Sequence, residues 1–436
     1  MAKKRVPTTR RHKATPRPRA ARTAGFDLKR FYRNLQIPSA EQALVADCLQ
    51  RGLKSYYGCV AGPGKKAPAG GLRDRLQQPY VFGFGVVEML REPALSADTC
   101  LKAVAWALEQ IDVEAEYGTP HGLPTMLSYL AHHARLEPVL FRSVMIAADF
   151  EGALFDDWQF EEVHELLNWV LERGGLPHSE ALWWAWYITL HCEPPGICRS
   201  LAETLMAHAA LTPADKRGLC RAWLDDSAVG TPPAQWEAMQ AMLRGDVEGF
   251  ARYSAEAGMP VPEKLPSARE LEADFDTALD ALLDSEDGVE PPLLPVAMFR
   301  RMLVGPMGIV PLTPLVYRRE ALFALAGLGE EPLALCQHYL DSARGELHAD
   351  AINQGVADVL AAYSQQMPPD EVRALVERGV AASSAPTRKV FYQLGADLFG
   401  EDFASRAADD PAKLVRDWAA KRAAGTPAGR GRKARG

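Results

Sequence analysis

Long apolar runs are missing from this sequence. The longest candidate, MLVGPMGIVPLTPLV at 302–316, is interrupted by Pro306, Pro311 and Pro314, whereas a membrane helix needs about 18 apolar residues. The first residues also lack the apolar segment of a secretory signal peptide. We therefore expect no transmembrane span and no secretory leader.

Cysteine is scarce, and its number is odd. The cysteines are Cys48, Cys59, Cys100, Cys192, Cys198, Cys220 and Cys336. Scattered through a large chain, they are typical of reduced thiols in a cytoplasmic protein and not of a disulfide framework. The set nearest to a zinc site is His191, Cys192, Cys198, His208 and Cys220. Its Cys-x5-Cys spacing is looser than zinc sites use, and free cysteine is a common core residue, so we expect buried thiols and no metal site.

Acidic residues are nearly absent from both ends of the chain. Residues 1–34 contain twelve Lys/Arg against one acid, a net charge of +11. Residues 421–436 contain six Lys/Arg and no acid, a net charge of +6. The remaining 35–420 contain 31 bases and 55 acids, a net charge of −24. Two cationic ends therefore flank a strongly anionic body.

Both ends are also poor in large apolar residues, so neither is expected to bury enough surface to offset an ordering entropy of about 1–2 kcal/mol per residue. We predict disordered basic tails at 1–34 and 421–436. Because Lys/Arg runs displace counterions from phosphates, such tails suit nucleic acid or another polyanion. The residues assigned to this role are Lys3, Lys4, Arg5, Arg10, Arg11, Lys13, Arg17, Arg19, Arg22, Arg430, Arg432, Lys433 and Arg435. The alternatives are tails that only confer solubility, or tails that lie on the anionic body.

Alternation of apolar and polar residues, the signature of strands, is missing as well. Helical periodicity recurs instead, often after a capping residue or a proline at the start. The predicted helices span 39–57, 80–91, 98–111, 124–135, 138–148, 156–173, 179–192, 197–210, 213–225, 233–243, 246–257, 267–287, 315–327, 331–343, 349–365, 369–382, 386–399 and 411–423. The segment 181–192, ALWWAWYITLHC, is apolar nearly all round and predicts a helix at the centre of the core. The fold class is all-α, with antiparallel helix pairs stacked as in an α-solenoid.

Composition shifts suggest an order of domains along the chain. A proline-rich passage at 288–314 interrupts the helical rhythm and follows an amphipathic helix with an acidic exterior at 267–287. The predicted parts are a basic tail at 1–34, a helical domain at 35–258, an acidic helix and connector at 259–314, a helical domain at 315–420, and a basic tail at 421–436.

One stretch, 369–423, carries a recognisable pattern. It contains Asp410, then Val415-Arg416, then Ala419 or Ala420. Val372-Arg373-Ala374 matches part of the same pattern more weakly. This stretch resembles HEAT-type repeats, whose second helix commonly carries Asp, then Val-Arg, then Ala. The resemblance implies a curved α-solenoid that serves as a binding surface. An irregular helical bundle is the alternative that packing rules also allow.

Each candidate catalytic or ligand-binding motif in the sequence lacks some of the residues that its chemistry requires. The loop GCVAGPGKKAP lacks the first glycine and the Ser/Thr of a phosphate-binding loop, and DSEDG at 284–288 lacks the ligands of a calcium loop. Glu161 and His164 have the Glu-x-x-His spacing of di-iron bundles, but no second pair accompanies them. We predict no catalytic residue and no cofactor.

Three functions are compatible with these patterns. The leading hypothesis is a non-enzymatic scaffold or adaptor that binds a protein partner through its helical surface and a polyanion through its tails. The second, an alkyl-base DNA glycosylase of the HEAT-like class, requires basic side chains along a groove, such as Arg300, Arg301, Arg318 and Arg319. The third is a protein–protein adaptor whose tails clamp its own acidic helix. The oligomeric state is left open.

Overall fold

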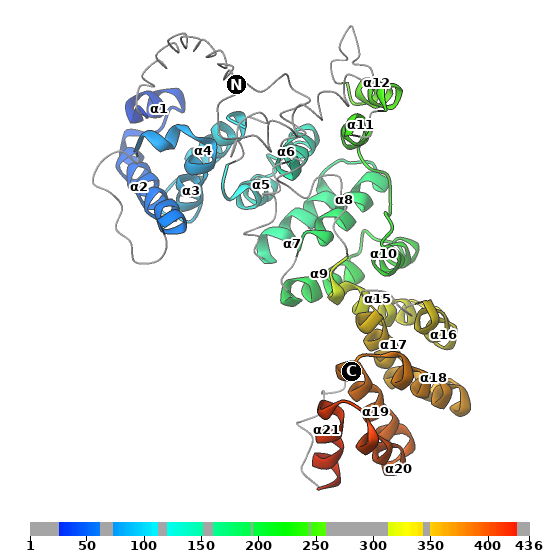
Figure 1. Cartoon of the computed structure of the whole chain (residues 1–436). Coiled ribbons are helices and arrows are strands. Elements are labelled where there is room, and N and C mark those ends of the chain that lie inside the picture. Colours follow the sequence, from blue (N-terminus) through cyan, green and yellow to red (C-terminus); the bar gives the residue numbers. More distant parts are fainter. Residues whose placement is uncertain are drawn as a thin grey trace, which may run out of the picture. The chain divides into compact units, whose positions relative to one another are not determined.

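A computed structural model shows the architecture of most of the chain. It describes residues 26–61, 73–111, 120–150, 160–192, 195–243, 246–258, 313–342 and 349–424. Within these ranges every regular element is a helix, which confirms the predicted all-α class (Figure 1). None of these helices has both the length and the apolar character needed to cross a lipid bilayer. The helices form two compact units, which divide after Gln110.

The first unit is organised around a close contact between two helices. Its elements are α1 (Leu28–Asn34), α2 (Ser39–Ala61), the 3-10 helix η1 (Arg73–Gln77), α3 (Pro79–Leu90) and α4 (Ala97–Glu109). Helix α3 packs against both α2 and α4. A Cβ atom on Gly52 would lie only 2.4 Å from the amide nitrogen of Gly85. Glycine at this crossing therefore lets α2 and α3 approach backbone to backbone.

The structure differs from the predicted tail 1–34 at its inner end. Residues Leu28–Asn34 form α1, and the Asp27 side chain caps the helix by accepting hydrogen bonds from two backbone amides of the first turn. Phe31 is 4% exposed, and its ring lies 5.6 Å from that of Phe82 in α3. Burial of this ring against a helix 50 residues away supplies the apolar contact that the local composition did not reveal.

The second unit contains two rows of helices. The first row consists of α5 (Leu123–His132), α7 (Phe160–Asn168), α9 (Pro195–Ala207), α15 (Leu315–Gly327), α17 (Ala349–Tyr363), α19 (Ala385–Phe399) and α21 (Lys413–Ala423). Each helix of this row packs against the next one in that order. A π-helical turn, η2 (Trp169–Arg173), follows α7 directly, so the helix predicted at 156–173 changes its winding at its C-terminal end.

The second row lies alongside the first. It consists of α8 (His178–Leu190), α10 (Pro213–Asp225), α16 (Pro332–Ser342) and α18 (Pro369–Ala382). Helix α8 packs on α7, α10 on α15, α16 on α17, and α18 on α19. The unit also contains α6 (Pro138–Phe150), α11 (Ala234–Leu243), α12 (Val247–Glu256), α20 (Glu401–Ser405) and the 3-10 helices η3 (Ser364–Gln366) and η4 (Arg406–Asp409). Stacked helix pairs of this kind confirm the solenoid-like arrangement.

Helix α8 is enclosed by its neighbours, as its apolar sequence predicts. Trp183, Trp184 and Trp186 are at most 3% exposed. The Trp183 ring stacks on Tyr187 at 4.7 Å and lies 5.4 Å from Trp236 of α11. These tryptophans pack the core and do not present a surface for base stacking.

Helix α15 packs against α9 and α10, although residues 226–314 separate it from α10 in the sequence. The helices on either side of 259–312 therefore belong to one stack. The acidic helix predicted at 267–287 lies outside the described residues, as does nearly all of the connector predicted at 259–314.

Candidate functional site: a polar ladder along one row of helices

The residues predicted to bind a polyanion belong to segments that the structure does not describe. Lys3 through Arg22 precede residue 26, and Arg430 through Arg435 follow residue 424. The start of the predicted C-terminal tail is helical, since α21 continues to Ala423 and Arg422 binds Glu401 and Asp397. The assignment of these residues to polyanion binding stays a prediction.

The HEAT-like pattern marks a group of residues that meet in space. Val415 is fully buried and Ala419 is 8% exposed, whereas Ala420 is exposed. The guanidinium of Arg416 donates to the backbone oxygens of Asp410 (2.7 Å) and Pro411 (2.6 Å). Arg416 thus holds the turn that leads into α21, and Ala419 is the member of the alternative pair that packs inward.

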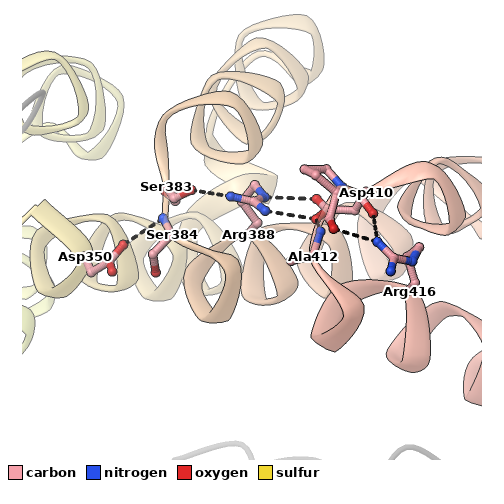
Figure 2. Close-up of polar contacts among 8 residues, drawn as sticks. Asp350, Ser383, Ser384, Arg388, Asp410, Ala412 and Arg416 are labelled. Atoms are coloured by element: carbon pink, nitrogen blue, oxygen red, sulfur yellow. Dashed lines mark hydrogen bonds and ion pairs between the residues drawn. The ribbon is translucent and has the colours of Figure 1, made fainter.

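Asp410 joins this turn to the preceding helix of the row. Its two carboxylate oxygens each accept a 2.9 Å hydrogen bond from Arg388 of α19, and one of them accepts another from the backbone amide of Ala412 (Figure 2). Asp410 is 4% exposed. The hydrogen bonds from Arg388 hold the pKa of the Asp410 carboxyl below its ordinary value, because they favour the charged form.

Arg388 also hydrogen-bonds to the backbone just before the start of α19, its own helix. Arg388 donates to the backbone oxygen of Ser383 at 2.9 Å, and the neighbouring amide of Ser384 donates to Asp350 of α17 at 3.0 Å (Figure 2). Beside this contact, the amide group of Asn353 donates to the Ser383 hydroxyl at 3.0 Å. The polar contacts therefore continue from α19 to α17.

Two further residues of α17 extend the contacts in both directions. Gln354 donates to the Thr387 hydroxyl of α19 at 3.3 Å and accepts from Arg319 of α15 at 3.2 Å. Arg319 binds both carboxylate oxygens of Asp358, at 2.7 and 3.2 Å. The hydrogen bonds from Arg319 to Asp358 raise the pKa of the Arg319 guanidinium.

Arg318 occupies in α15 the place that Arg388 occupies in α19. Each is the fourth residue of its helix and donates to the carbonyl oxygen five positions earlier, that of Thr313 or Ser383. Arg318 is 1% exposed and also donates to the Leu224 carbonyl at 3.0 Å and to the Asp226 carboxylate. The stack repeats the same arginine contact two helices apart.

A carboxylate also accepts a backbone hydrogen bond near the start of each of these two helices. The Asp226 carboxylate accepts from the Thr313 amide, five residues before Arg318, at 3.1 Å, and Asp350 accepts from the Ser384 amide, four residues before Arg388, at 3.0 Å. Burial acts to raise the pKa of Asp226, but the hydrogen bonds from Arg318 and Thr313 outweigh it and lower the pKa.

We call this set of side chains the polar ladder. Its members are Asp226, Arg318, Arg319, Asp350, Asn353, Gln354, Asp358, Ser383, Ser384, Thr387, Arg388, Asp410 and Arg416. The HEAT-like pattern identified Asp410 and Arg416, whereas Arg318 and Arg319 were named only for a DNA-binding groove. An arginine at the fourth position of both α15 and α19 is the sequence signal that marks Arg318 and Arg388.

Beside the ladder, α15 exposes an apolar and charged surface. Leu315 is 51% and Phe323 40% exposed, and Arg319 lies between them. Residues four apart share one side of a helix, so the three form a stripe, which we call the α15 stripe. The Phe323 ring lies 6.1 Å from that of Tyr363 at the end of α17. The stripe therefore borders the next helix of the row.

The arginines invoked for a DNA-binding groove have other roles. Arg318 is buried against Asp226, and Arg319 is paired with Asp358. Arg300 and Arg301 lie outside the described residues. Neither of the two described arginines offers an unpaired charge to a phosphate.

The sets considered for metal binding do not assemble. No group of three or more His, Cys, Asp or Glu side chains among the described residues has the geometry to hold a metal ion. Cys192, Cys198 and Cys220 are buried thiols. His164 of the Glu-x-x-His pair contacts the amide group of Asn168 at 3.1 Å, while Glu161 is exposed.

Comparison with known proteins adds no relative. No family model, curated protein or solved structure matches this chain. The functional argument therefore depends on the geometry alone.

Proposed function

We propose that this protein is a non-enzymatic, HEAT-like helical scaffold of the cytoplasm. It binds a protein partner through the α15 stripe, and its basic ends contact nucleic acid or another polyanion. The observation that carries the proposal is the combination of a polar ladder with an exposed stripe on the same helix. Arg318 holds the buried side of α15, whereas Leu315 and Phe323 are exposed on the other side and flank Arg319, which is paired with Asp358.

The ladder supports a scaffold because it fixes the relative positions of successive helices. Each of its hydrogen bonds to a charged group contributes about 1.5–3 kcal/mol, and each has a preferred direction. In a stack held in this way, the surface side chains keep fixed positions relative to one another. A partner then binds without the entropic cost of ordering the surface.

The α15 stripe supports a protein partner because it combines the residue types that dominate interfaces. Aromatic side chains and arginine are enriched at the centre of protein interfaces, and most of the binding energy resides in a few such residues. The cysteines agree with a reducing compartment, since all seven lie among the described residues and none of them forms a disulfide.

The test is affinity purification with full-length protein as bait, with and without nuclease. The first variant is Leu315→Ser with Phe323→Ser. The matched control is Val139→Ser with Leu414→Ser, which changes two residues that are 67% and 48% exposed on other helices. Proteins that wild type and control retain after nuclease treatment should be lost from the α15 variant. Retention of the same proteins by all three baits would contradict the proposal.

A further inference from the structure

Helix α1 presents a compact basic face. Lys29, Arg30 and Arg33 are all exposed. At 3.6 residues per turn these three positions fall within an arc of about 100°. The buried side chains of Phe31 in α1 and of Leu35, its C-cap residue, lie on the opposite side of the helix. The three cationic groups therefore point away from the first unit.

The part of the chain that the structure describes leaves the charges of this face without an ion pair. No carboxylate of the described residues forms an ion pair with Lys29, Arg30 or Arg33. Asp27, the only acid among residues 1–34, caps α1 by accepting hydrogen bonds from the Lys29 amide at 2.9 Å and the Arg30 amide at 3.3 Å. Its negative charge thus lies at the positive end of the helix.

Other arginines of the described residues, unlike the bases of α1, form ion pairs. Arg51 contacts Glu88 at 3.5 Å and Glu92 at 2.9 Å, and Arg142 binds Glu180 at 2.6 Å. Helix α1 instead carries three exposed bases on one face with no ion pair among the described residues. These charges are available to an anionic ligand.

Helix α1 is fixed to the rest of its unit. The Phe31 ring lies 5.5 Å from Trp106 of α4 and 5.6 Å from Phe26, which contacts Phe82 and Trp106 in turn. The Tyr32 hydroxyl donates to the Gln42 carbonyl of α2 at 2.8 Å. The three bases thus project from a held backbone, and binding them costs less conformational entropy than binding a chain that must first be ordered.

The sequence before α1 continues the positive charge. Nine more Lys/Arg occur between residues 3 and 22, with no acid among them. Because the body from 35 to 420 carries a net charge of −24, it repels a polyanion elsewhere. The favourable interaction is confined to the basic ends of the chain.

We propose that Lys29, Arg30 and Arg33 form a nucleic-acid interface on α1 and bind the phosphate backbone. This inference rests on the polyanion binding proposed above and adds three residues that the tail assignment did not include. Seven helical residues span about 10 Å. Over that length one DNA strand presents about three phosphate charges, at about one per 3.4 Å, which is one for each base.

Nucleic acid fits this face better than a membrane does. A helix that binds anionic lipid inserts a large apolar face between the headgroups. The apolar residues Phe31 and Leu35 are at most 7% exposed and pack within the unit. The exposed side of α1 therefore offers charge without the apolar surface that a bilayer requires.

The experiment measures binding of the full-length protein to a fluorescein-labelled 20-nucleotide single strand by anisotropy, over a series of salt concentrations. The variant is Lys29→Ala, Arg30→Ala and Arg33→Ala together. The matched control replaces three other exposed bases, Lys54, Arg91 and Arg135, by alanine. Both variants change the net charge equally, and thermal melting verifies that both are folded.

The α1 variant should bind about tenfold or more weakly near 0.1 M salt, and its log–log salt dependence should be shallower by about 2, at about 0.7 per lost phosphate contact. The control should keep most of the wild-type affinity. Equal salt slopes for wild type and the α1 variant would overturn this inference but leave the proposed polyanion binding intact. Absence of wild-type binding at low salt would overturn both. Binding of phosphatidylserine vesicles in place of the oligonucleotide, lost in the α1 variant, would overturn nucleic acid as the ligand.

Discussion

Arg388 of α19 and Asp410, which lies just before α21, form a two-bond ion pair across successive helices of one row. Both hydrogen bonds measure 2.9 Å, and the Asp410 side chain is only 2% exposed. Because the carboxylate is removed from water, it depends on this partner for its solvation. The pair is therefore the contact on which the end of the stack most depends.

Replacing Asp410 by Ala should open the last helices of the stack. Removing one partner of a buried pair costs about 3 kcal/mol, which corresponds to about a hundredfold rise in local opening. Hydrogen–deuterium exchange of peptides from α19 and α21 measures this opening. The control is Glu377→Ala, which breaks the exposed pair with Arg406 (43% and 51% exposed) and should cost no more than about 1 kcal/mol. Equal exchange in both variants would contradict the role of the ladder.

Two glycines of α2 should respond to the same substitution with opposite signs. A Cβ on Gly52 would lie 2.4 Å from the Gly85 backbone, whereas nothing lies within 4 Å of a Cβ on Gly58. Gly52→Ala should lower the free energy of unfolding by about 1–3 kcal/mol, because the helices must separate. Gly58→Ala should raise it by up to about 1 kcal/mol through helix propensity. Thermal melting compares them; a Gly52→Ala protein as stable as wild type would show that α2 and α3 do not cross there.

Stability should fall as the pH drops below about 6.5. Burial lowers the pKa of His191 to about 3, while an unfolded histidine titrates near 6.5. The unfolded chain therefore binds the proton first, so the free energy of unfolding falls by about 2 kcal/mol between pH 7 and pH 5 from this residue. Burial lowers the pKa of His208 as well, which adds to the effect.

Denaturant titrations at pH 7 and pH 5 measure this loss, and His191→Gln provides the comparison. The variant should lose less stability than wild type over the same interval. Carboxylates such as Asp226 and Asp410, whose pKa values are lowered, affect stability only nearer pH 4 and below. An unchanged loss in the His191→Gln protein would assign the pH dependence to other groups.

Alkylation by iodoacetamide should modify one cysteine of the native protein. Cys59 is exposed, and the other six are buried. Burial raises the pKa of Cys220 and of Cys336 to about 12, so little of the reactive thiolate forms at neutral pH. Intact-mass measurement should show one adduct under native conditions and seven in denaturant. Rapid native modification of a second site would show that the stack opens.

Helix positions followed closely from the sequence. The helices predicted at 213–225, 315–327 and 369–382 have the observed bounds of α10, α15 and α18, because proline or a capping residue marks each start. Helix α1 did not follow, since its seven residues read as part of a basic tail. Its stability comes from Phe82 and Trp106, which lie 51 and 75 positions after Phe31.

By itself the sequence determined the all-α class, the bounds of helices such as α10, α15 and α18, and the separation of charge between ends and body, because these depend on residues close together in the chain. Only the tertiary structure decided which arginines are buried in the ladder and which remain exposed. Arg318 and Leu224 are 94 positions apart, and Arg199 and its partner Glu320 are 121 apart. A side chain's partner at such a separation depends on how the helices stack, and a local pattern does not encode that.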